Sequence, residues 1–305
     1  MRIGLNGGGR DADRMVEQAI QAEADGFHAL WYPGAVGGDP LVAMALAGRA
    51  TERIELGTSV LQTYPAHPYL MANRAASTAS AMNRPGFVLG VGPSHEPVIA
   101  GMYNEDFGHP GRHTEEHVTI LTALLHGETV TFTGEDLSLR GGKIAVPPHP
   151  VPVLVAALGP RLLRVAGAIA DGTVLWMANA RAIETHVGPL VGKAAASAGR
   201  PAPRVVAGLP VAVHDDVDEA RSAAAEQFTI YGLLPNYQRI LEHGGAAGPG
   251  DAAIVGDEAS VAAQLQGLID AGATDIWAAT FTVGDDKRGS RARTNALLQE
   301  LANAS

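Results

Sequence analysis

The chain has 305 residues, of which 46% are hydrophobic, and its 32 acidic and 22 basic residues give a formal net charge of −10. This balance excludes a nucleic-acid partner, because proteins that bind phosphodiesters cluster Lys and Arg, and the sequence has no such cluster. The absence of cysteine excludes disulfides, thiolate metal sites and a cysteine nucleophile. The length and apolar content predict one large core in a single domain spanning residues 1–305.

The sequence contains no run of about 18 apolar residues, so it predicts no membrane span and no membrane partner. It opens with the strand-like segment Met1–Leu5, without a basic region followed by an apolar segment of signal-peptide length. We therefore expect a soluble, cytoplasmic protein.

The first half of the chain alternates strand patterns with helix patterns. Asp11 and Gly26 mark the ends of the first expected helix, Asp39 caps the second with Pro40 at its first position, and Pro68 opens the third. A fourth helix is expected from Arg112 to Leu125. The strands that precede these helices are predicted at residues 2–6, 28–32, 54–60 and 87–92.

The second half repeats this alternation and carries two insertions. Strands are predicted at 153–157, 173–177, 205–213 and 275–281, and the helices that follow the first two of these are expected to reach Ala170 and Ala198. A β-hairpin near 128–146 turns at Gly134. A helical insertion near 216–256 contains a helix at 218–231 and a Gly/Pro-rich mobile surface loop at 244–250, and further helices are expected at 258–271 and 290–302.

Strict alternation of this kind predicts a parallel sheet, most simply a closed (β/α)₈ TIM barrel, with a doubly wound open sheet as the alternative. Function in such barrels sits where the strands end. Three segments end an apolar strand in Gly, Ser or Pro, which suggests one ligand cradle: Leu56–Pro68, Phe87–Glu96 and Val151–Pro160.

The segment Gly159-Pro160 opens a helix, and the free N–H groups and dipole of a helix N-terminus favour an anion. This predicts a phosphate or diphosphate site. The alternative is a plain strand-to-helix turn with Pro160 at the first helical position.

These motifs resemble the luciferase-like family of barrel enzymes, in particular its branch that uses the deazaflavin coenzyme F420. The resemblance covers nearly the whole chain in order. It rests on Leu56-Gly-Thr-Ser-Val60, His67-Pro68, Leu89-Gly-Val-Gly-Pro-Ser-His95, Arg112 with Glu116, Ala156-Ala-Leu-Gly-Pro160, Ala166-Gly167, Ala170-Asp-Gly172 and Asp270-Ala-Gly-Ala-Thr274.

The resemblance implies a non-proline cis peptide at Ser59–Val60 that presses against the back of the tricyclic ring. It further implies that Gly90 and Gly92 let the chain approach the cofactor, and that backbone N–H groups of residues 156–159 face its phosphate. The cofactor-binding residues it implies are Asn6, Thr58, Ser59, Val60, His67, Gly92, Ser94, His95, Ala156, Ala157, Leu158, Gly159 and Pro160.

The chain departs from the family pattern at the end of the second strand. Many F420 enzymes of the family carry an acidic residue followed by His there, whereas this sequence reads Tyr32-Pro-Gly-Ala-Val36. We therefore expect His95, which can change protonation state near pH 7, to be the catalytic residue, with Glu96 either orienting it or lying at the surface.

Other polar and aromatic residues suggest further roles. Trp176 and Asn179 are expected to border the substrate pocket. His113 and His117 share a helical face, but no further ligand accompanies them at a strand end, so no metal site is predicted.

We therefore expect an F420-dependent oxidoreductase that transfers a hydride between the deazaflavin C5 and a small organic substrate. One alternative is an FMN-dependent two-component monooxygenase subunit of the same family, and a second is a non-catalytic flavin- or F420-binding barrel. The resemblance also implies a homodimer formed through the helices after the second and third strands, where small residues would allow close approach: Ala43, Ala45, Ala47, Ala72, Ala75 and Ala76.

Overall fold

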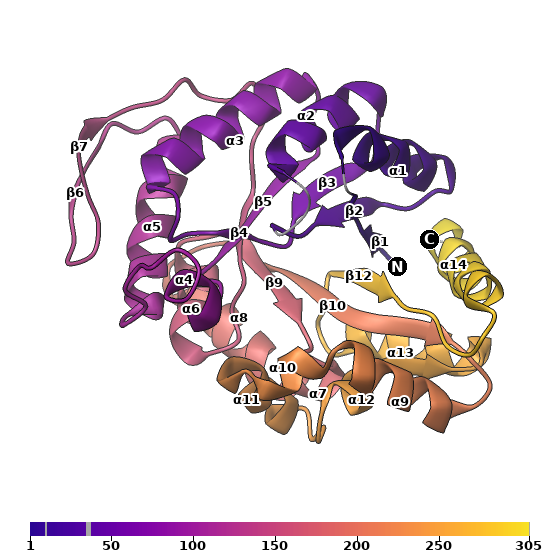
Figure 1. Ribbon diagram of the computed structural model, residues 1–305. Helices are drawn as coiled ribbons and strands as arrows, with labels where there is room; N and C mark the ends of the chain where they lie inside the picture. The colour runs from indigo at the N-terminus through magenta and orange to yellow at the C-terminus, as the bar shows by residue number, and fades with distance from the viewer. Residues whose placement is uncertain (10, 35–37, 305) are drawn as a thin grey trace.

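The structure is a computed structural model that describes residues 1–9, 11–34 and 38–304 (Figure 1). Eight parallel strands form a closed barrel, in which each strand pairs with its neighbour and the last pairs with the first. This closure confirms the TIM barrel and excludes the open sheet. The barrel strands are β1 (Ile3–Asn6), β2 (Ala29–Tyr32), β3 (Glu55–Thr58), β5 (Phe87–Gly92), β8 (Val153–Val155), β9 (Gly172–Trp176), β10 (Arg204–Val213) and β12 (Asp275–Thr280).

Helices surround the barrel (Figure 1). Their apolar side chains are buried against it. Side-chain caps fix where several begin, because Asp11 accepts a hydrogen bond from the Arg14 N–H and Asp39 accepts one from the Leu41 N–H. The outer ring is α1 (Ala12–Ala24), α2 (Pro40–Ala50), α3 (Pro68–Met82), α5 (Pro110–Leu125), α6 (Pro160–Ala168), α8 (Gly188–Ser197), α13 (Glu258–Asp270) and α14 (Lys287–Asn303).

Short elements interrupt this plan at the strand ends. β4 (Leu61–Gln62) adds a second pairing to β5, and α4 (Glu96–Ile99) follows β5 directly. The single helix expected after β9 is broken into α7 (Ala180–Ala182), a π-helical turn η1 (Ile183–Val187) and α8. Within the described ranges, no helix combines the length and the apolarity needed to cross a bilayer.

The predicted hairpin is present, with β6 (Val130–Thr133) antiparallel to β7 (Ser138–Gly142), and it extends away from the barrel in Figure 1. The Glu116 carboxylate holds its turn by accepting N–H bonds from Glu135, Asp136 and Leu137 at 2.9, 3.0 and 2.7 Å. A carboxyl group on a barrel helix therefore fixes the position of this insertion.

The second insertion differs from its prediction. It contains α9 (Val217–Gln227), α10 (Thr229–Leu233), α11 (Pro235–His243), α12 (Pro249–Ala252) and a strand that the sequence did not predict, β11 (Ile254–Gly256), which pairs with the end of β10. The prediction of a mobile surface loop at 244–250 is wrong at its end. Pro249 and Gly250 are buried, because Gly250 packs so closely on α9 that an added Cβ would lie 2.6 Å from the Arg221 carbonyl oxygen.

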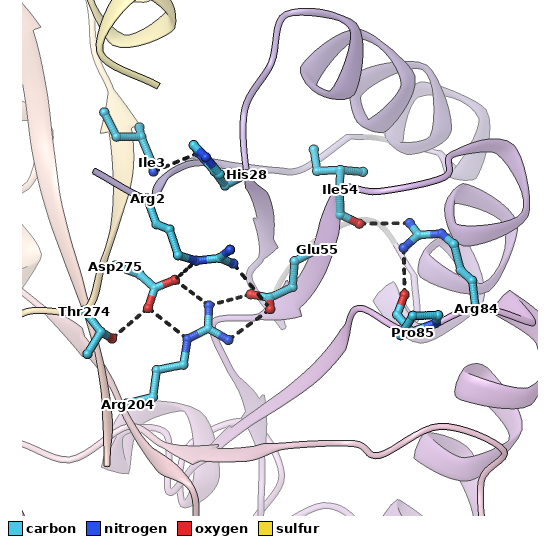
Figure 2. Close-up of polar contacts among 10 residues, drawn as sticks. All are labelled: Arg2, Ile3, His28, Ile54, Glu55, Arg84, Pro85, Arg204, Thr274 and Asp275. Carbon is cyan, nitrogen blue, oxygen red and sulfur yellow. Dashed lines mark hydrogen bonds and ion pairs between the residues drawn. The ribbon is translucent and has the colours of Figure 1, made fainter. Parts of the chain in front are cut away.

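An ion-pair network closes the N-terminal end of the barrel (Figure 2). The Arg204 guanidinium donates to the Asp275 carboxylate at 2.6 and 2.9 Å and to the Glu55 carboxylate at 2.6 and 3.0 Å. Arg2 adds a bond to Asp275 at 2.7 Å, and the Trp31 ring lies 5.7 Å from the guanidinium carbon of Arg204. These charges join the starts of β1, β3, β10 and β12, away from the strand ends where function is expected.

The alanines expected at a dimer interface lie mostly inside the protomer. Ala43, Ala47, Ala72, Ala75 and Ala76 are buried in the core, so they pack α2 and α3 on the barrel instead of offering a free surface. The large apolar side chains that these helices expose are Val42, Leu46, Tyr69 and Leu70.

Candidate active site

A cavity of about 780 Å³ opens at the carboxyl ends of the barrel strands. Asn6 at the end of β1, Gly92 at the end of β5 and Trp176 at the end of β9 all line it. Residues of α10 and α11 line it as well, so the helical insertion contributes a wall over the mouth of the barrel.

One wall of the cavity is formed by strand ends whose backbones lie close together and carry only small or apolar side chains. The Ser59–Val60 peptide is cis, which confirms what the resemblance implied. Gly92 lies beside it, and an added Cβ would come 2.8 Å from the Ala156 Cβ and 3.1 Å from Val60 Cγ2. Gly90 is as tightly placed, because its added Cβ would lie 2.0 Å from the Thr58 carbonyl oxygen. Only glycine fits at these positions, so the wall has no projecting side chain there.

Two hydroxyl groups behind this wall behave differently. Thr58 is fully buried, and its Oγ1 both donates to the Gly90 carbonyl and accepts from the Gly90 N–H, each at 2.8 Å. Ser59 Oγ is also buried but has no hydrogen-bond partner among the described residues, although Ser59 lines the cavity. A buried hydroxyl without a partner is costly, so Ser59 is a place where a ligand would complete the bonding.

The segment after β8 forms the end of the cavity suited to an anion. Gly159 is the N-cap of α6, whose first turn contains Pro160 and no acidic residue. Arg161 lies in the same turn and pairs with Glu115 at 2.7 Å. His186 Nε2 lies 2.9 Å from the Leu158 carbonyl oxygen, and the His186 ring stacks on His243 at 3.8 Å.

The charges that line the cavity have one sign. Among the described lining residues the charged ones are two arginines, Arg161, which is paired with Glu115, and Arg239, and none is a carboxylate; His95, His186 and His243 also line the cavity. In a chain with a net charge of −10, this separation favours an anionic ligand at the cavity.

His95 is the N-cap residue of α4, and its side chain makes no capping bond. The ring lines the cavity and lies 5.6 Å from the Tyr237 ring, centroid to centroid. Burial lowers the pKa of His95 below its ordinary value of 6.5, so the imidazole is neutral at pH 7. Glu96 is exposed and has no hydrogen bond to His95 in the described structure, so it does not orient the imidazole.

Most of the predicted site residues meet in this cavity. Those that line it are Asn6, Ser59, Val60, Gly92, Ser94, His95, Ala156, Ala157, Leu158, Gly159 and Pro160. Thr58 and His67 do not line it. His67 caps α3 by accepting from the Tyr69 N–H, and its Nε2 lies 3.1 Å from the Ser138 carbonyl oxygen of the hairpin.

The end of β2 contributes backbone rather than a titratable group. Tyr32 is buried and donates its hydroxyl to the Met15 carbonyl at 3.0 Å, and burial raises its pKa. Pro33 and Gly34 line the cavity, whereas Ala35 and Val36 lie outside the described residues. Nothing described at this strand end replaces the missing acid and His.

Trp176 and Asn179 were both expected to border the pocket, and only Trp176 lines the cavity. Trp176 lines the cavity and stacks on Trp277 at 4.9 Å, as expected of a pocket residue. Asn179 caps α7 and donates to the Gly244 carbonyl at 3.0 Å, so it joins the helical insertion to the barrel and does not line the cavity.

The histidines of α5 are part of the packing. His117 is fully buried with Nε2 at 3.0 Å from the Ala66 carbonyl oxygen, and burial lowers its pKa to about 3. His113 stacks on Tyr64 at 3.9 Å.

Sequence reasoning missed the aromatic wall from the insertion, formed by Phe228, Tyr231 and Tyr237. The signal was the density of aromatic side chains within residues 228–237, in a segment that no family motif covered.

The closed barrel and the cavity at its carboxyl face define a TIM-barrel enzyme whose site suits an anionic cofactor with a flat apolar part. The chain belongs to the luciferase-like monooxygenase family, which it matches over residues 2–301.

Relatives and solved structures agree with this placement. A 5,10-methylenetetrahydromethanopterin reductase from Methanolobus tindarius is 25% identical over 289 residues, covering 93% of this chain and 86% of the relative. An F420-dependent secondary alcohol dehydrogenase in complex with an F420-acetone adduct has a similar fold, with a TM-score of 0.80, 18% identity and coverage of 100% and 98% of the two chains. A type II Baeyer-Villiger monooxygenase of Pseudomonas putida in complex with FMN has a TM-score of 0.72, 16% identity and coverage of 99% and 97%.

Proposed function

We propose that the protein is a coenzyme F420-dependent oxidoreductase that transfers a hydride between C5 of the deazaflavin and a small organic substrate. The observation that carries this proposal is the combination, in one cavity, of an apolar wall closely packed at Gly92 and the N-terminus of α6, with no carboxylate among the described lining residues. Relatives whose names describe them as F420-dependent oxidoreductases or dehydrogenases support it, as does the solved structure with an F420-acetone adduct and the same fold.

The residues present fit such a cofactor. Val60, Gly92 and Ala156 would hold the ring system, since the tight packing at Gly92 keeps side chains out of its place. Ser59 Oγ, buried and unpartnered, would gain a hydrogen-bond partner. The N-terminus of α6, with Arg161 in its first turn, would hold the phosphate group. When bound, the deazaflavin would supply the hydride chemistry, and the protein would supply orientation and a dry setting.

His95 is the group that we propose moves the proton. Its imidazole is neutral at pH 7 because burial lowers its pKa, so it can accept a proton from a substrate hydroxyl. In the reverse direction the protonated ring would return it. No carboxylate among the described lining residues competes for this role.

FMN is the alternative cofactor, because it also joins a planar ring to a phosphate and is bound by a structure of the same fold. Such a protein would be the oxygenating subunit of a two-component monooxygenase. A barrel that binds F420 or flavin without turnover is the further alternative.

Titration of the purified protein with F420 and, separately, with FMN tests the proposal, with cofactor fluorescence as the readout. We expect F420 to bind at micromolar concentration or below and FMN to bind at least about tenfold more weakly, a difference of about 1.4 kcal/mol. Tighter binding of FMN than of F420 would instead support an FMN-dependent monooxygenase subunit. F420 binding without oxidation or reduction of any substrate in a broad screen would favour the non-catalytic barrel.

A homodimer and a cytoplasmic location are also proposed. The apolar side chains exposed on α2 and α3, among them Val42, Leu46 and Leu70, would form the dimer interface. Light scattering on the wild type and on Leu46→Arg tests this: we expect a dimer for the first and a monomer for the second. A wild-type monomer at micromolar concentration would refute it.

A further inference from the structure

The helical insertion places the Tyr237 ring beside the His95 ring. Tyr237, on α11, lines the cavity, and its ring is tilted by 51° against the His95 ring at 5.6 Å. Neither the Tyr237 hydroxyl nor the His95 imidazole has a hydrogen-bond partner in the part of the chain that the structure describes. Two adjacent side chains of the cavity therefore carry polar groups whose bonding capacity is unused, and a single substrate oxygen between them could bond to both.

Aromatic rings surround this pair of groups. Tyr237 meets Tyr231 edge to face at 4.9 Å, and Trp176 meets Tyr231 and Phe228 at 5.5 and 5.8 Å, also at steep angles. Each ring supports its neighbour, so the wall presents a fixed apolar surface. A wall of this kind can pack against an apolar ring, and it contains no charged side chain that would pair with a charged substrate group.

Arg239 and His243 of the insertion lie on another side of α11. At 100° per residue, Arg239 is about 200° around the helix from Tyr237, whereas His243 is only about 40° from Arg239. His243 stacks on His186, which contacts the Leu158 carbonyl beside the start of α6. Arg239 and His243 thus lie on one side of α11, where His243 reaches the start of α6 through His186, and Tyr237 lies on another side, next to His95.

We propose that Tyr237 is a second catalytic residue, which with His95 holds the substrate oxygen, and that the substrate is an uncharged, ring-bearing secondary alcohol or its ketone. This inference rests on the proposed function, which supplies the hydride acceptor. In the oxidation direction the C–H bond at the alcohol carbon breaks and its electron pair leaves as hydride to the deazaflavin, which is reduced. The O–H proton passes to neutral His95 while the substrate C=O bond forms, so the substrate is oxidised.

Tyr237 acts in this step as a hydrogen-bond donor to the oxygen as negative charge develops on it. Burial raises the pKa of Tyr237, so the hydroxyl keeps its proton across the working pH range. The division of roles is then specific: His95 changes protonation state and Tyr237 does not.

The experiment compares wild type, Tyr237→Phe, His95→Gln and the control Tyr103→Phe, each saturated with F420. Tyr103 is 41% exposed and does not line the cavity. The probes are cyclohexanol and 4-hydroxycyclohexanecarboxylate, which differ by one carboxylate, and the readout is the loss of oxidised F420. The dissociation constant of F420 is measured for every variant.

We expect wild type to prefer cyclohexanol by at least about tenfold in kcat/KM. Tyr237→Phe should lower kcat about 100-fold, the effect of losing one donor to a developing oxyanion, with F420 affinity unchanged. Its rate should still rise with pH as His95 loses its proton, whereas His95→Gln should lose that rise. Tyr103→Phe should match wild type.

A Tyr237→Phe variant with wild-type kcat would overturn the catalytic role of Tyr237. Preference for the carboxylate probe, or reaction with neither probe although F420 binds, would overturn the substrate class. Failure of wild type to bind F420 would instead refute the proposed function, and this inference with it.

Discussion

Replacement of Arg204 by methionine tests how the barrel is closed at its N-terminal end. Arg204 makes four hydrogen bonds to Asp275 and Glu55, whose side chains are 6% and 16% exposed (Figure 2). Methionine keeps an apolar stem of comparable length but removes the charge. The two carboxylates then remain close together with only Arg2 to neutralise them.

Removal of one partner from a buried ion pair costs about 3–5 kcal/mol. Arg204 is 21% exposed and Arg2 still contacts Asp275, so we expect the low end, a loss of about 3 kcal/mol in the free energy of unfolding. The assay is urea denaturation at pH 7. We expect Arg204→Met to unfold at a lower urea midpoint than wild type, with an unchanged dependence of the free energy of unfolding on urea concentration. F420 affinity should not change, because the network lies away from the cavity.

The pH dependence gives the second readout. Buried Asp275 has its pKa held below the ordinary 3.8 by hydrogen bonds from Arg204 and Arg2, although burial alone would raise it. A lowered folded-state pKa stabilises the protein above pH 3.8, and this contribution is lost as pH falls through the folded value. The gap between wild type and Arg204→Met should therefore be widest at pH 7 and narrow in acid. A loss below about 1 kcal/mol at pH 7 would show that water screens the network like a surface pair, and would refute the reasoning.

Three further predictions concern the site and its support. For alcohol oxidation, kcat/KM should rise with pH with its midpoint below pH 6.5, because burial lowers the pKa of His95 and its neutral form is the base; a pH–rate profile without this rise would exclude His95. Gly92→Ala should weaken F420 binding at least about tenfold, because its Cβ would push on Val60 and Ala156. The control is Gly192→Ala on α8, where an added Cβ has no atom within 4 Å; it should leave F420 binding unchanged and stabilise the helix by about 0.5–1 kcal/mol. Glu116→Gln should speed hydrogen exchange at amides 135–137, since a neutral side chain cannot accept all three bonds as strongly; unchanged exchange would show that the hairpin holds its own turn.

Local sequence predicted the helices and strands whose formation depends on a single segment of the chain. Asp11 and Asp39 cap the helices that they were expected to cap, and all eight barrel strands lie close to the predicted ranges. The structure of the insertion at 216–256 could be predicted only in part, because it depends on contacts with distant segments. Its strand β11 exists only because β10 offers a free edge, and Gly250 is buried only because α9 lies against it. Neither partner is near in sequence.

For the site, small residues at strand ends were sufficient to predict the cavity wall. The backbone must come close there, and Gly92 and the cis Ser59–Val60 peptide lie where the motifs placed them. His67 belongs to the same motif but does not line the cavity, because its ring caps α3 and contacts the hairpin. The sequence gives no sign that the β6–β7 hairpin contacts His67.

The amino-acid sequence by itself determined the barrel, the family and the position of the ligand cradle, because hydrophobic period, caps and glycines act over a few residues. Tertiary structure alone decided that Tyr237 lies against His95, that His243 stacks on His186, and that Arg204 joins Glu55 to Asp275. These pairs are separated by up to 149 residues. Their proximity follows from closure of the barrel and folding of the insertion over its mouth, and no local pattern encodes it.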